Sequence, residues 1–310
     1  MFEGHAPAGG FATSWGLGFL LLLASCAHGA VAKRPYPAPD PAALLGAIKT
    51  RQAAIRGADL ETRTTSWLGG DRTRASVYML VDRQGRLRFE AEAALSGPVA
   101  TLVANPQTFS LLDLREQRFE HGPACPENIA RLIPVALHPQ EIAAILLGDV
   151  PLAEGARVVG LGWNKALGAD VLEIDNPGAQ SALTRHLWVS LQHQGPAGGQ
   201  GPAGAANAGG GPGAWQIVAL EAGGSAERRW QVRFSEHEAA EGVPYRLPTE
   251  IQIAEPGQSF DDGVEIQIRE RTLNPTFRPT AFDLVAPQGF QVQTVACCPE
   301  CQAPNPPPSP

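Results

Sequence analysis

Cysteine is the residue type whose spacing in this chain most directly suggests chemistry. Cys298 and Cys301 form a C-x-x-C pair next to Cys297, and Cys125 lies far upstream. Such a pair is typical of redox sites and of metal knuckles, but a metal site needs a second pair of ligands, and the neighbouring sequence supplies none. A redox pair would follow a βαβ unit, whereas this one precedes a proline-rich tail. We therefore expect a structural disulfide among these four cysteines, with a redox role as the alternative and the pairing left open.

Cys26, the remaining cysteine, follows a short apolar run. Residues 17–24 are too few to span a bilayer, which takes about 20 apolar residues, but they have the length of the apolar region of a secretory signal. Small residues, Ala24 and Ser25, directly precede the cysteine. These features predict cleavage before Cys26 and an exported mature chain.

The stretch Leu23-Ala24-Ser25-Cys26 resembles the lipobox of bacterial lipoproteins. The resemblance implies that 1–25 is a signal peptide and that the Cys26 thiol receives a diacylglycerol, with further acylation by chains such as palmitate. Two or three acyl chains suffice for stable anchoring. Because no Lys or Arg precedes residue 26, an ordinary signal peptide with an incidental cysteine is the alternative.

The residues after Cys26 predict where the chain is held. Ala27 is not the aspartate that retains lipoproteins of enteric bacteria in the inner membrane, so we expect an outer-membrane lipoprotein facing the periplasm. Residues 26–40 are rich in Ala and Pro and indicate a lipidated tether rather than part of the fold. The net charge of −7 excludes a basic surface for nucleic acid.

No catalytic motif accompanies these features. The sequence has no nucleophile elbow, metalloprotease histidine pair, P-loop or dinucleotide-binding glycine pattern. The seven histidines are scattered, and none has the spacing of a metal ligand. We expect a protein that is not an enzyme and uses no cofactor and no metal.

The elements that position any site are mainly strands. An amphipathic helix begins at Asp40-Pro41 and ends at Gly57, and two short helices are expected over 126–133 and 139–147. Alternating apolar residues predict strands before and after this helix pair. The expected strands are 75–81, 87–93, 99–103, 108–114, 115–121, 158–163, 169–174, 185–191, 215–220, 230–234, 247–253 and 264–270, with short last segments at 281–284 and 288–292.

These elements predict one domain over 41–295. A single curved antiparallel sheet with one apolar face fits the pattern, forming an unclosed half-barrel that the first helix and the helix pair cover only partly. The fold class is therefore mainly β (α+β), and a partly covered apolar face leaves an apolar cavity. The glycine-rich stretch 195–213 is expected to be a flexible insertion and 296–310 a Cys/Pro-rich tail.

The order of elements in 41–152 resembles the LolA/LolB lipoprotein-localisation family. The resemblance lies in a first helix near "LLGAIKTRQAAIRGADLET", the turn "ALSGPVATLVAN" followed by "FSLLD", and the ending "ILLGDVP". Near the C-terminal end, "PTAFDLVAPQGFQV" resembles the closing segment of these domains.

The resemblance implies a half-barrel with a two-helix lid that holds acyl chains, so that lipoproteins are taken from a soluble periplasmic carrier and delivered to the outer membrane. It also implies an apolar transfer residue on an early hairpin, for which Leu95 is the candidate. The partners would be acyl chains of lipoproteins or lipids, a periplasmic carrier, and the membrane through the N-terminal lipid.

Strand and helix periodicity selects the residues expected to line the cavity. A register shift of one residue would turn any strand's set outward. The candidates are Val77, Met79, Leu87, Phe89, Phe109, Leu111, Ile129, Leu132, Ile142, Ile145, Leu146, Trp230 and Val232. The alternative function is a non-catalytic structural or assembly lipoprotein whose interior is filled and which binds an envelope protein.

Overall fold

The structure is a computed structural model that describes residues 33–68, 71–93, 97–132, 135–181, 184–194, 214–223, 230–255 and 257–297. Several sequence predictions lie outside these residues: the signal peptide, Cys26, Leu95, the insertion 195–213, Cys298 and Cys301. Among the described residues, no helix is both long enough and apolar enough to span a membrane.

In the described part of the chain, fourteen strands form one sheet, in the order β14-β6-β5-β4-β3-β2-β1-β13-β12-β11-β10-β9-β8-β7. Their bounds are β1 Gly57–Leu68, β2 Asp71–Asp82, β3 Leu87–Ala93, β4 Gly97–Ala104, β5 Thr108–Asp113, β6 Arg118–Pro123, β7 Arg157–Asn164, β8 Ala169–Asp175, β9 His186–His193, β10 Trp215–Ala222, β11 Trp230–Ala239, β12 Arg246–Ala254, β13 Val264–Leu273 and β14 Gln291–Thr294.

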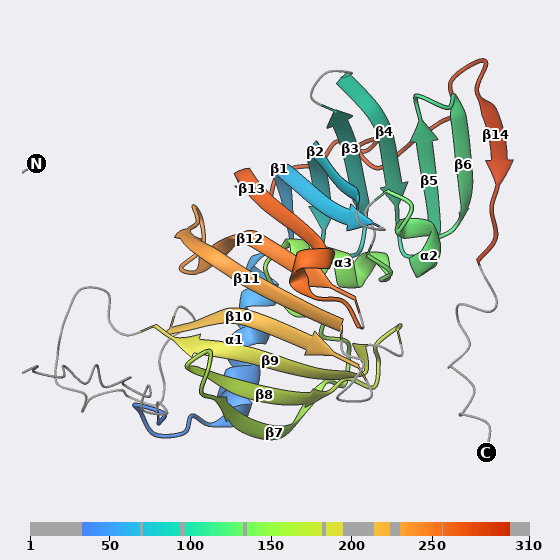
Figure 1. Ribbon diagram of the computed structural model, residues 1–310. Coiled ribbons are helices and arrows are strands. Elements are labelled where there is room, and N and C mark those ends of the chain that lie inside the picture. Colours follow the sequence, from blue (N-terminus) through green and yellow to red (C-terminus); the bar gives the residue numbers. More distant parts are fainter. Residues whose placement is uncertain are drawn as a thin grey trace, which may run out of the picture. The chain divides into compact units, whose positions relative to one another are not determined.

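The sheet is not closed into a barrel. Its end strands, β14 and β7, pair only with β6 and β8 respectively and lie apart in Figure 1. Neighbouring strands are antiparallel except β14, which runs parallel to β6. The predicted unclosed half-barrel, mainly β with few helices, is confirmed, and the parallel edge strand is its one departure from the expected pairing.

The helices lie on the inner side of the sheet (Figure 1). They are α1 Pro41–Ala54, α2 Pro126–Ile129 and α3 Pro139–Leu146, with a 3-10 turn at Phe260–Asp262. As expected, Asp40 caps α1, because its side chain accepts a hydrogen bond from the amide of Ala42 at 3.1 Å. The second helix is shorter than predicted, since it ends at Ile129 rather than 133.

Alternation decides which side chains face the core. In β3, Leu87, Phe89 and Ala91 are buried, while Arg88 and Glu90 face away and pair with each other at 2.6 Å. In β13, Val264, Ile266 and Ile268 are buried in the same way. Helix and sheet residues of this kind form one continuous core.

Strand β1 is the main element that periodicity missed. Its inward positions after Ala58 and Leu60 are Thr62 and Thr64, which are polar residues but only 1% and 8% exposed. The Thr62 hydroxyl donates a hydrogen bond to the Val77 carbonyl at 2.8 Å, so its burial leaves no donor unsatisfied. A pattern of apolar residues cannot detect such a strand.

The C-terminal segment also differs from expectation. Residues 281–284 form turns rather than a strand, and the last strand is Gln291–Thr294 instead of 288–292. The Arg88 guanidinium holds this segment against the sheet by donating to the Asp283 carbonyl at 3.1 Å.

Candidate functional site

The residues predicted to line a cavity come together in a single core. All are buried except Leu132, which is partly buried and packs against the same core. They come from β2, β3, β5, β11, α2, α3 and the turn after α2. That they contact a ligand is a prediction.

An apolar cavity lies between α3 and the sheet. It is lined by Phe89 of β3, Val135, three residues of α3, Ile253 of β12 and Ile266 of β13. Four of the sequence candidates, Phe89, Ile142, Ile145 and Leu146, are among its seven lining residues. The other three were missed, although Ile253 and Ile266 follow the same alternation as their neighbours.

The cavity is very small in this structure. The centre of a water molecule could move through only about 10 Å³ of it. That space is close to the minimum for one water. A long acyl chain therefore cannot enter unless lining residues move.

The start of α3 is held by Glu141. This carboxylate is 5% exposed, accepts a hydrogen bond from the His138 amide at 3.0 Å, and accepts another from the Thr184 hydroxyl. The first contact is the backbone half of a capping box. The second joins the helix to the turn before β9.

The end of α3 is held by a tight turn. Gly148 has a φ of +71°, and a Cβ there would lie 2.7 Å from Pro248 Cδ, so both conformation and space require glycine. The turn exposes the Gly148 carbonyl to Arg51 of α1, which donates to it at 2.7 Å. Gln52 donates to the carbonyl of Val150 at 2.7 Å.

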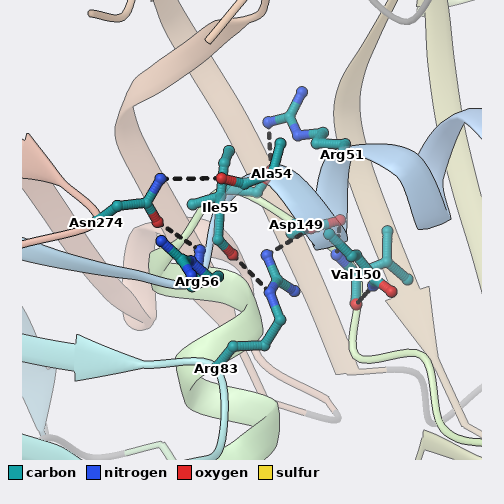
Figure 2. Close-up of polar contacts among 10 residues, drawn as sticks. Arg51, Ala54, Ile55, Arg56, Arg83, Asp149, Val150 and Asn274 are labelled. Atoms are coloured by element: carbon teal, nitrogen blue, oxygen red, sulfur yellow. Dashed lines mark hydrogen bonds and ion pairs between the residues drawn. The ribbon is translucent and has the colours of Figure 1, made fainter. Parts of the chain in front are cut away.

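A polar network lies beside this turn; we call it the buried polar network and define it as Arg51, Arg83, Asp149 and Asn274 (Figure 2). Arg51 and Asp149 are buried, and the other two are partly buried. Arg83, from the turn between β2 and β3, pairs with Asp149 at 3.0 Å and donates to the Ile55 carbonyl at 2.7 Å. One side chain thus bridges the end of α1 and the turn after α3.

Asn274, directly after β13, contacts the end of α1. Its amide nitrogen donates to the Ala54 carbonyl at 2.9 Å, and its oxygen accepts from the Arg56 amide at 2.7 Å. These contacts satisfy backbone groups that the end of α1 leaves open. Figure 2 shows Asn274 and Arg83 meeting the same end of the helix.

Burial sets the electrostatics of the buried polar network. Burial raises the pKa of Asp149, which is 0% exposed, while the charges of Arg83 and Arg51 act in the opposite direction. Burial lowers the pKa of Arg51, whose guanidinium also lies 5.6 Å from the ring of Tyr245. None of these residues was a sequence candidate, because patterns of apolar residues do not mark buried charges; only the ending "ILLGDVP" pointed to the turn.

A histidine, His237, lies on β11 near Arg51, Arg246 and Arg271. The Nε2 atom of His237 donates to the Ile217 carbonyl at 2.9 Å. Burial, followed by the positive charges of Arg51, Arg246 and Arg271, lowers the pKa of His237 to about 4. The folded protein therefore resists protonation of this side chain.

We expect stability to fall on acidification because of His237. Its pKa drops from an ordinary 6.5 to about 4 on folding, so in that pH window the unfolded chain binds a proton that the folded protein does not. The contribution is complete above pH 6.5 and is lost as the pH falls toward 4, by about 2 kcal/mol after allowance for partial exposure. Urea unfolding of wild type and His237→Gln at pH 7.5 and 4.5 measures it; an equal pH dependence in both proteins would contradict the assignment.

The structure also joins two of the candidate cysteines. Cys125, directly before α2, forms a disulfide with Cys297, at a Cα–Cα distance of 6.0 Å. The bond ties the start of the helix pair to the segment after β14. Among the described residues, no cluster of three or more His, Cys, Asp or Glu side chains is arranged to hold a metal ion.

No family model matches the sequence, and no curated protein matches it. Solved structures match the fold. A LolA-superfamily protein from Nitrosomonas europaea aligns with a TM-score of 0.51 and 9% identity, over 80% of this chain and 98% of that one. An outer-membrane lipoprotein-sorting domain from Vibrio parahaemolyticus aligns with a TM-score of 0.50 and 8% identity, over 77% of this chain and 95% of that one. The unclosed sheet and its inner helices therefore have the same fold as these two solved proteins.

Proposed function

We propose that this chain is a lipoprotein, anchored in the outer membrane through acylated Cys26 and facing the periplasm. It binds acyl chains of lipoproteins or lipids beneath α3 and helps to deliver them to the membrane. The proposal includes no catalysis and no cofactor. The observation that carries it is the apolar cavity between α3 and the sheet.

The lining of the cavity suits an acyl chain. All seven lining side chains are apolar, and a hydrocarbon chain makes no polar contact that such a wall would have to satisfy. Each methylene moved from water into this environment contributes about 0.8 kcal/mol. A chain several carbons long would therefore gain favourable free energy from burial once the cavity has opened.

Entry of the chain requires α3 to leave the sheet. The residues of α3 that face the cavity, Ile142, Ile145 and Leu146, make apolar contacts that a ligand can replace with equivalent ones. The closed and loaded states then differ little in free energy, which allows both uptake and release. The buried polar network opposes opening from the Gly148 end, because opening there would separate Asp149 from Arg83.

In this proposal, delivery of the acyl ligand needs no external source of free energy. A ligand passes from a carrier to this chain when the new cavity binds it more favourably, and onward to the bilayer when the membrane does. A soluble periplasmic carrier is the partner we propose for uptake. The lipoprotein-sorting name of the Vibrio domain supports this role by fold alone.

Filling the cavity should weaken binding. Val135 lines the cavity and is 2% exposed, so Val135→Phe should weaken fluorescent fatty-acid binding by about tenfold or more, or about 1.4 kcal/mol. The measurement is a titration of the chain from residue 27 onward, combined with identification of lipid that co-purifies with it.

Val189→Phe is the matched control. Val189 of β9 is 0% exposed and does not line the cavity. Both substitutions overpack the core at a cost of about 1–3 kcal/mol, but only Val135→Phe should affect binding. No co-purifying lipid together with no saturable binding by the wild type would contradict the proposal.

The closed state of the cavity favours a second candidate function. Room for about one water also fits a structural or assembly lipoprotein whose interior stays filled and whose outer surface binds an envelope protein. The titration separates the two, because this candidate predicts no acyl binding in any variant.

A further inference from the structure

The segment before α1 is attached to the sheet rather than free. Arg34 and Tyr36 are partly buried, whereas Lys33, Pro35 and Pro37 between and beside them are exposed. This alternation is that of an extended segment with one face against a surface. It contradicts the expectation of an unattached tether for the residues that the structure describes.

The segment before α1 contacts a group of aromatic side chains that surround one carboxylate, which we call the aromatic box. We define the box as Trp163 of β7, Asp170 of β8, His193 of β9 and Trp215 of β10. Trp163 is the register partner of Asp170, and His193 that of Trp215, which brings four neighbouring strands to one site.

The ring of Tyr36 fills the box. Its centroid lies 5.0 Å from that of His193 and 5.9 Å from those of Trp163 and Trp215, the tryptophan contacts being edge-to-face. These distances and angles are the favoured ones for aromatic pairs. The guanidinium of Arg34 lies 5.4 Å from the Trp163 ring centre, as in a cation–π contact.

Asp170 gives the site its charge preference. Its side chain is 0% exposed; one oxygen pairs with Arg34 at 2.6 Å and the other accepts from the Tyr36 hydroxyl at 2.9 Å. Both contacts come from the segment before α1, so its departure would leave a buried carboxylate without these partners, which is strongly unfavourable. Burial, and then the hydrogen bond to Asp170, raise the pKa of Tyr36.

We propose that the aromatic box is a binding site for the chain's own Arg34-Pro35-Tyr36 segment, and that this clamp sets how far the domain reaches from the membrane. The inference about reach rests on the proposed lipid at Cys26. The clamp itself rests only on the described contacts.

The length of chain between Cys26 and the clamp limits how far the domain can lie from the bilayer. Cys26 and Lys33 are 7 positions apart, which span at most about 25 Å. With the clamp released, the attachment point becomes Asp40, 14 positions from Cys26, and the limit rises to about 50 Å. The clamp thus keeps the β7–β10 end of the sheet close to the bilayer.

The test uses the full-length lipidated chain in phospholipid vesicles that contain an acceptor-labelled lipid. A fluorescent amino acid at Lys165, an exposed residue of the turn between β7 and β8, is the donor. Hydroxyl-radical footprinting of Trp163 and Trp215 reports the clamp directly, because the Tyr36 ring packs against both of them. The variant is Arg34→Ser with Tyr36→Ser, and the control is the neighbouring exposed Lys33→Ser.

We expect Trp163 and Trp215 to become more strongly oxidised in the double variant, and energy transfer from Lys165 to fall, because the reach limit rises from about 25 Å to about 50 Å. Lys33→Ser should behave as wild type. Unchanged oxidation of both rings in the double variant would overturn the clamp, and increased oxidation with unchanged transfer would overturn its effect on reach. If the wild type fails to float with vesicles, the lipid anchor of the proposed function is wrong and the reach inference with it, while the footprinting result still decides the clamp.

Discussion

Replacing Arg83 by methionine should lower the free energy of unfolding by about 3–5 kcal/mol. The substitution leaves the Asp149 carboxylate, which is 0% exposed, without the guanidinium that pairs with it at 3.0 Å. It also removes the donor to the Ile55 carbonyl. The midpoint of thermal unfolding should fall by roughly 6–20 °C, measured by circular dichroism.

Arg86→Met is the matched control for Arg83→Met. Arg86 lies in the same turn between β2 and β3, but it is exposed and pairs with Asp82. That carboxylate also accepts hydrogen bonds from the amides of Gln84 and Arg86, at 3.0 and 3.1 Å, which the control retains. The expected loss is therefore below about 1 kcal/mol.

A second substitution tests the reason for the loss. Asp149→Asn in the Arg83→Met background removes the unpaired charge and keeps an oxygen for the Val150 amide, now 2.8 Å from Asp149. The double variant should recover part of the stability that the single variant loses. Equal losses for Arg83→Met and Arg86→Met would mean that the buried charge is not what the pair stabilises.

Removing the disulfide should have the second large effect. Cys125→Ser should lower the free energy of unfolding by about 2–4 kcal/mol, because the bond closes a long loop in the unfolded chain. The two cysteines are 172 residues apart. Strand β14, four residues that are all exposed, should also lose protection from hydrogen exchange, since it would retain only its pairing with β6.

Cys298→Ser and Cys301→Ser are the controls for this prediction. Neither should change stability if Cys125 pairs with Cys297. Mass mapping of unreduced peptides identifies the bond directly. A stability loss with Cys298→Ser as large as with Cys125→Ser would point to a different pairing.

Local pattern was sufficient for most of the core. The alternation in β3 and β13, and the 3.6-residue spacing in α3, correctly placed Phe89, Ile142 and Ile145 on the inner side. Burial of apolar side chains is a local preference that repeats along each element, so it can be read one element at a time. The unclosed, mainly β fold followed from the same pattern.

Buried polar residues could not be predicted from the apolar pattern. Strand β1 was missed because Thr62 and Thr64 face the core, and the buried polar network was missed because Asp149 pairs with Arg83, 66 positions away. A buried polar residue is stable only with a partner, and the partner here comes from another element. No local window contains both.

The sequence by itself determined which residues are apolar, how they alternate, and that four cysteines beyond Cys26 are available for a disulfide. Only the tertiary structure decided that Cys125 pairs with Cys297, that Arg83 pairs with Asp149, and that Tyr36 binds the aromatic box. The reason is that burial follows from a residue's own chemistry and its period. A pairing depends on which distant strands and turns the sheet brings together.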